Sequence, residues 1–238
     1  MADQPADITI IPIASCTFFL TKKPWDFADR NARAIDMHWE KASAERPKLF
    51  NGIIHLLASW QVSEGTLSGT FLRTDFKSFL YWRETGYGDA GVKDAFGSSL
   101  ICSADGAVLL GRQTEGNMNA GLAYPPSGMI DVDDVGPNGI DIDTNVAREL
   151  GEECGLGPSE LDRVPGYLVA FAGPLVAIAI EWRSKLDAEA LRARMLKHVR
   201  SQHAPELADV VIVRGRGEID AVGAPPYARA LLGRILSA

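Results

Sequence analysis

The sequence has few cysteines, no surplus of positive charge and no hydrophobic run long enough to cross a bilayer. Its three cysteines, Cys16, Cys102 and Cys154, are widely spaced and form no CxxC pair. An odd number without such a pair favours reduced thiols, which predicts a cytoplasmic location. The lack of a long apolar run predicts that the protein has no membrane partner.

Basic residues are in the minority. Lysine and arginine total 24 against 31 aspartate and glutamate residues, a net charge of −7. A chain with this balance is not expected to bind nucleic acid. The balance is compatible with a site that holds a phosphate ligand through a metal ion. The four histidines show no metal-ligand spacing, so they do not indicate a metal site of their own.

With 238 residues the chain can bury a sizeable core, and its length permits one domain or two. The residue pattern changes near residue 90. We therefore predict an N-terminal β/α extension over residues 1–90, packed on the core, and a second domain over residues 91–238.

Apolar runs, turn residues and capping residues predict alternating strands and helices along the chain. In the first part we expect a strand at 8–13, a helix at 25–45, a hairpin of strands 53–62 and 66–72, and a helix capped by Thr74 or Asp75 that runs through Glu84. In the second part we expect a hairpin of strands 99–104 and 107–113 around Asp105-Gly106, two strands within 164–182, a helix at 187–203, a strand at 210–213 and a helix at 227–236.

One predicted helix carries an acidic face. At helical spacing, Glu149, Glu152 and Glu153 fall within one arc and the apolar residues fall in another. We expect this helix to begin with Asp143 or Thr144 as its N-cap and to end at Gly155.

Three acids at this spacing repel one another by a few tenths of a kcal/mol per pair. Two interpretations explain what offsets the repulsion. Either the face is solvated and Arg148 pairs with Glu152 four residues later, or the acids hold a hard divalent cation, which prefers carboxylate oxygens.

The segment from Arg148 to Leu156 resembles the second half of the signature of the Nudix hydrolases, without a mismatch. The first half is altered. The residues ending in Gly128 stand where that family usually has a Pro-Gly-Gly turn, and Asp134 stands where it has a glutamate. Thirteen residues instead of seven separate Asp134 from Arg148, which indicates a six-residue insertion within 135–143. The role of the missing glutamate is left open among Asp134, Asp141 and Asp143.

The resemblance implies an α/β (α+β) fold, namely a Nudix-type α/β/α sandwich with a mixed sheet behind the N-terminal extension. It also implies a hydrolase that uses Mg²⁺ or Mn²⁺ to cleave the pyrophosphate bond of a nucleoside diphosphate linked to another moiety. The order of the N-terminal extension, the Gly69–Phe76 segment and the insertion resembles the branch that cleaves UDP-glucose and UDP-galactose, which implies a nucleotide sugar. ADP-ribose, dinucleoside polyphosphates and coenzyme A are the alternative substrates that the sequence leaves open. It also leaves open a homodimer.

The resemblance also assigns roles to residues. It implies Arg148, Glu149 and Glu152 as catalytic residues, Arg112 and Gly128 as substrate-binding residues, and Gly128, Glu149, Glu152 and Glu153 as metal ligands. The general base is left open between a glutamate of the motif and an acid outside it; the candidates outside are Glu181, Glu206 and Glu218. The altered first half of the signature leaves an alternative function open: a catalytically impaired Nudix-fold module that binds nucleotides or has a regulatory role.

Overall fold

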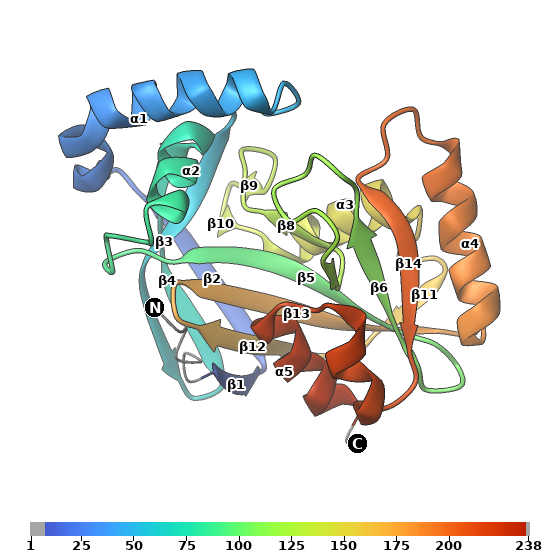
Figure 1. Ribbon diagram of the computed structural model, residues 1–238. Coiled ribbons are helices and arrows are strands. Elements are labelled where there is room, and N and C mark those ends of the chain that lie inside the picture. Colours follow the sequence, from blue (N-terminus) through green and yellow to red (C-terminus); the bar gives the residue numbers. More distant parts are fainter. Residues whose placement is uncertain (1–7, 237–238) are drawn as a thin grey trace.

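The computed structural model describes residues 8–236, which form five α-helices, one 3₁₀ helix and fourteen strands in two sheets (Figure 1). Residues 1–7, which belong to the predicted N-terminal extension, lie outside the described residues. None of the helices in the described part is long and apolar enough to cross a membrane.

The larger sheet, called sheet A here, is mixed. Its central strands β13 and β5 run parallel, and the other neighbours along its main path are antiparallel. In spatial order the path is β1 (Ile8–Ile13), β12 (Tyr167–Ala172), β13 (Leu175–Ser184), β5 (Asp94–Cys102), β6 (Val108–Gln113) and β14 (Leu207–Val213). The short strands β7 (Ala123–Tyr124), β8 (Ser127–Met129) and β11 (Leu161–Arg163) pair with β6, β5 and β13.

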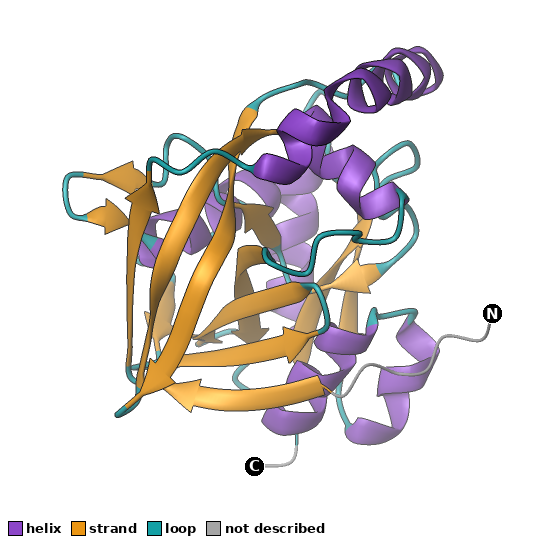
Figure 2. Cartoon of the chain, turned by 90° about the vertical axis from the view of Figure 1, so that its left-hand side faces the viewer, coloured by secondary structure: helices purple, strands orange, loops and turns teal. Residues whose placement is uncertain are grey.

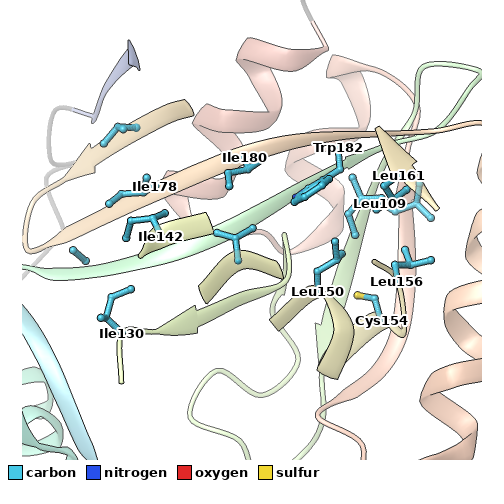
Figure 3. Close-up of a cluster of buried hydrophobic side chains, with 14 of the residues drawn as sticks. Leu109, Ile130, Ile142, Leu150, Cys154, Leu156, Leu161, Ile178, Ile180 and Trp182 are labelled. Carbon is cyan, nitrogen blue, oxygen red and sulfur yellow. The ribbon is translucent and has the colours of Figure 1, made fainter. Parts of the chain in front are cut away.

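Helices cover both faces of sheet A. Helices α3 (Ile142–Cys154) and α4 (Ala188–Ser201) lie on one face, and α5 (Pro226–Ile235) lies on the other with the 3₁₀ helix η1 (Arg216–Val222). Successive side chains of a strand point in opposite directions, so those of β13 alternate between the two faces of sheet A. Ile178 and Ile180 join the cluster around Leu150 of α3, shown in Figure 3, whereas Ala177 and Ala179 join the cluster under α5. The expected α/β/α sandwich with a mixed sheet is confirmed.

The second sheet, called sheet B, lies beside the first (Figure 2). Its order is β3 (Ile53–Ser63), β4 (Thr66–Asp75), β2 (Ser15–Thr21), β10 (Gly139–Ile140) and β9 (Val135–Gly136). Helices α1 (Asp26–Glu45) and α2 (Phe76–Glu84) pack on it through an aromatic cluster that includes Trp25, Phe79 and Trp82. The predicted insertion at 135–143 thus forms a small hairpin, and its Ile140 pairs with Phe18 of β2.

The two predicted domains exchange strands. Strand β1 belongs to sheet A, whereas the hairpin of β9 and β10 belongs to sheet B. One buried cluster also contains side chains from both parts of the chain, such as Phe18 and Phe71 with Ile130 and Leu150. The boundary near residue 90 stays a prediction, and the described parts on either side of it share a core.

Helix α3 begins earlier than predicted. Its N-cap is Asp141, whose carboxylate accepts hydrogen bonds from the Thr144 backbone N–H at 3.1 Å and the Thr144 hydroxyl at 2.9 Å. The prediction of Asp143 or Thr144 as the cap was wrong, because the side chain of Asp143 points to Arg163 instead, at 2.7 Å. The predicted end is confirmed, since Gly155 closes the helix at φ +66°.

Asp141→Ala removes the side-chain acceptor of this cap and leaves backbone donors of α3 unsatisfied. We expect the free energy of unfolding to fall by about 1 kcal/mol, measured by urea denaturation. Asp133→Ala, at an exposed position just before the hairpin, is the control and should leave stability unchanged. Equal stability of the two variants would contradict the capping assignment.

Candidate active site

The acidic face of α3 borders a surface cleft of about 710 Å³. Glu149 and Glu152 line it from the helix, and Gly128 lines it from β8. The segment 48–54, which includes the start of β3, forms another stretch of its wall, and Glu206 lies on the side next to β14. The cleft is therefore built from segments that are far apart in the sequence.

Arg148 joins four carboxylates at this cleft. Its guanidinium donates to Glu149 at 2.6 Å and to Glu152 at 3.3 Å, and it reaches Asp134 at 3.1 Å. Asp131 lies 3.4 Å away as a further ion pair. This geometry fits the positioning role that the resemblance implies for Arg148, because one side chain fixes two acids of its own helix.

Asp134, of the three acids considered for the altered half of the motif, is the one that reaches Arg148. It is buried and also accepts a hydrogen bond from the Asn145 side chain at 2.9 Å. Burial raises its pKa, although Asn145 and Arg148 oppose the rise. Asp141 caps the helix and Asp143 pairs with Arg163, so both are engaged elsewhere.

The inner acids of the cluster, Glu153 and Glu149, lie in surroundings that oppose their ionisation. Glu153 is 4% exposed; its Oε1 accepts from the Ser127 backbone N–H at 3.1 Å, and its Oε2 has no partner among the described residues. Burial, together with Glu206 and Glu149, raises its pKa well above the usual value. Burial also raises the pKa of Glu149 to about 7, with Arg148 opposing the rise.

Glu206 is the acid outside the motif that the structure brings to this cluster. Burial raises its pKa, and the charge of Glu152 raises it further. The other two candidates lie elsewhere: Glu181 pairs with Arg183 at 2.8 Å beside a different groove, and Glu218 accepts from the Arg214 backbone N–H. No local signal distinguishes Glu206 in the sequence, since its position depends on how the segment before β14 packs.

Gly128 lies directly against Glu149. A Cβ atom at this position would stand 1.9 Å from Glu149 Oε1, so a side chain there would displace the carboxylate. The structure does not bring Arg112 to the cluster. Its guanidinium donates to the backbone oxygens of Gly121 at 2.8 Å and Val222 at 3.3 Å, a contact that joins two loops.

The donor set fits a hard divalent cation. Carboxylate oxygens are what Mg²⁺ prefers, and the unpartnered oxygen of Glu153 together with the raised pKa values marks a place where added positive charge would be favourable. Within residues 8–236, no three His, Cys, Asp or Glu side chains are already arranged as a group that could hold a metal ion. Glu149 and Glu152 instead point to Arg148.

A second, smaller cavity of about 170 Å³ adjoins the cleft and shares Ser127 and Gly128 with it. Asp94 and Arg83 line this cavity among aromatic and apolar side chains. Burial raises the pKa of Asp94 to about 6, and the nearby charge of Arg83 opposes the rise.

Several solved structures are similar to this chain at low identity. A MutT protein from Methanosarcina mazei Go1 is 22% identical with a TM-score of 0.41, and the match covers 60% of this chain and 92% of that one. The Nudix hydrolase RenU from M. smegmatis is 15% identical with a TM-score of 0.40, over 60% and 83% of the two chains. The Nudix domain of Shewanella oneidensis NrtR, solved with ADP ribose, is 14% identical with a TM-score of 0.41, over 60% and 85%. No family model matches the chain, and no curated protein matches it by sequence.

The raised pKa of Asp94 makes stability depend on pH. Between the ordinary pKa of 3.8 and the folded-state value of about 6, the folded protein keeps a proton that the unfolded chain has lost. Stability therefore falls as pH rises through this window, by at most about 3 kcal/mol from this group.

Asp94→Asn removes this ionisation without changing the shape of the side chain. We expect the variant to be more stable than the wild type above pH 6 and equally stable near pH 3.5, measured by urea unfolding at both pH values. Asp162→Asn, the same change at an exposed position, should have no effect at either pH. A variant that is less stable than the wild type at pH 7.5 would show that the Asp94 carboxylate stabilises the fold.

Proposed function

We propose that this protein is a Nudix-type hydrolase that depends on a divalent metal and cleaves the pyrophosphate bond of a nucleoside diphosphate linked to another moiety. The observation that supports the proposal is the acidic surplus on α3. Burial raises the pKa values of Glu149, Glu153 and Glu206, and the charges of neighbouring carboxylates, that of Glu152 among them, raise these values further. Arg148 is the basic side chain that contacts Glu149 and Glu152.

Bound Mg²⁺ or Mn²⁺ would offset the charge of the phosphate oxygens and lower the pKa of a bound water. Glu149, Glu152 and Glu153 would hold the metal through their carboxylates, and the Gly128 backbone would serve as a further ligand next to Glu149. Arg148 would keep Glu149 and Glu152 aligned along the cleft. These roles match the resemblance of the Arg148–Leu156 segment.

We assign Glu206 as the acceptor of the proton from the attacking water. Its raised pKa lies in the direction that favours a general base near neutral pH. The water oxygen would form a bond to one phosphorus, and the bridging oxygen would leave with the other phosphate. The products would be a nucleoside monophosphate and the phosphorylated second moiety.

We further propose a nucleotide sugar as the substrate, on the likeness to the branch that cleaves UDP-glucose and UDP-galactose. ADP-ribose, dinucleoside polyphosphates and coenzyme A are the other compounds to test. The cytoplasmic location, the homodimer and the lack of a nucleic-acid partner stay predictions from the sequence.

A second candidate function is a ligand-binding or regulatory module without turnover. The hydrogen bonds of Arg148 to Glu149, Glu152 and Asp134 favour it, because in this arrangement an arginine already neutralises part of the cluster. Tight nucleotide binding without metal, together with no release of monophosphate, would identify such a module.

The first test is Mg²⁺-dependent release of nucleoside monophosphate from a panel of UDP-glucose, ADP-ribose, diadenosine tetraphosphate and coenzyme A. We expect Glu152→Gln and Glu153→Gln to lower kcat by roughly 100-fold or more, since each removes charge that acts directly at the metal. Glu160→Gln, an acid of the chain that pairs with Arg194 instead, is the control. Undiminished turnover in both variants would remove these acids from the mechanism.

The second test separates the three acids outside the motif. Glu206→Gln should lower kcat by at least about tenfold, because positioned proton transfer contributes roughly 10²- to 10⁴-fold. Glu181→Gln and Glu218→Gln should keep wild-type turnover, since neither acid lies at the cleft. If Glu206→Gln is as active as these two variants, the proton acceptor must be an acid of the motif.

A further inference from the structure

The cavity beside the cleft combines apolar walls with two charged side chains. Phe79 comes from α2, Phe96 comes from β5, and Tyr124 lines both the cavity and the cleft. Ser127 and Gly128 line both spaces, so a ligand held in the cleft next to Glu149 would extend into the cavity.

Asp94 is the buried polar group of this cavity. It is 8% exposed and faces the cavity, yet within the described part of the chain its carboxylate accepts no hydrogen bond and forms no salt bridge. A carboxylate buried without partners destabilises the folded state unless another group donates to it. Its environment therefore suits a ligand that brings hydrogen-bond donors.

Arg83 lines the same cavity and is a hydrogen-bond donor, whereas Asp94 is an acceptor. Contacts with the protein hold the Arg83 side chain in place. Its guanidinium donates to the Asn119 side-chain oxygen at 2.7 Å, and the Asn119 amide donates to the Tyr124 hydroxyl at 3.1 Å. This chain of contacts fixes Arg83 at the cavity before any ligand arrives. Preorganised donors and acceptors reduce the entropy that is lost on binding.

We propose that this cavity binds a ring that carries hydrogen-bond donors, joined to the diphosphate in the cleft, with Asp94 accepting from the ring and Arg83 donating to it. The proposal rests on the proposed function for the diphosphate. The aromatic walls would pack against the faces of the ring. Either a sugar ring or a nucleobase has this chemistry, because both present O–H or N–H donors beside acceptors.

Binding is measured by isothermal titration calorimetry in EDTA at pH 7.5, so that no metal-dependent hydrolysis takes place. The probes are UDP-glucose, UDP, glucose 1-phosphate and ADP-ribose. We expect the wild type to bind at least one of the diphosphate compounds, and Asp94→Asn to weaken that binding by roughly 10- to 100-fold, since hydrogen bonds to a charged group are lost. Asp162→Asn is the matched control and should bind as the wild type does.

The probes distinguish the two sources of the ring. If Asp94→Asn loses affinity for UDP-glucose but not for UDP, the sugar lies in the cavity. If it loses affinity for both to the same extent, the base lies there. Arg83→Gln provides a second variant, for which the same probe should lose affinity. The proposal is overturned if Asp94→Asn and Arg83→Gln bind every probe as tightly as the wild type. Where the wild type binds no probe in EDTA, the proposal is overturned if both variants keep the wild-type KM with Mg²⁺, or if the wild type hydrolyses no probe.

The result is separable from a failure of the proposed function. Binding that depends on Asp94, without hydrolysis, would support the cavity assignment and identify a binding module. Hydrolysis that depends on Glu152 and Glu153, with unchanged affinity and KM in Asp94→Asn, would support the proposed enzymatic activity and overturn the cavity assignment.

Discussion

The site depends on the close approach of helix α3 to sheet A. Two paired glycines, Gly97 on β5 and Gly128 on β8, permit this approach. A Cβ atom on Gly97 would stand 2.1 Å from Asn145 Oδ1, and one on Gly128 would stand 1.9 Å from Glu149 Oε1. Because neither position has a side chain, the helix lies against the sheet, and Glu149 and Glu153 are largely buried beside the β8 backbone, whereas Glu152 is exposed.

That burial gives the acids their unusual properties. Carboxylates removed from water and placed near one another resist ionisation, so the pKa values of Glu149, Glu153 and Glu206 are raised, with burial as the largest cause in each case. Arg148 compensates part of the charge and sets the direction of the Glu149 and Glu152 side chains. Such an arrangement lowers stability and favours a cationic ligand, a combination that is common at functional sites.

The sequence predicted the elements with strong local signals, namely the Asp105-Gly106 hairpin, the Gly155 helix end and the acidic face of α3. It did not predict β2, because the bend at Ala14 resembles the end of a strand, or the pairing of the 135–143 insertion with β2. The position of Glu206 beside α3 depends on long-range packing for which adjacent residues carry no signal. The cavity around Asp94 escaped prediction for the same reason, since its walls come from distant parts of the chain.

The central claim is that the acids of α3 form a site for a divalent cation. Titration with Mn²⁺, followed by the electron paramagnetic resonance signal of the free ion, tests it without any substrate. The account predicts that the wild type binds Mn²⁺ and that Glu149→Gln combined with Glu153→Gln weakens this binding by roughly tenfold or more, while Glu160→Gln leaves it unchanged. Equal Mn²⁺ binding by the wild type and the double variant, or no binding by the wild type, would contradict it.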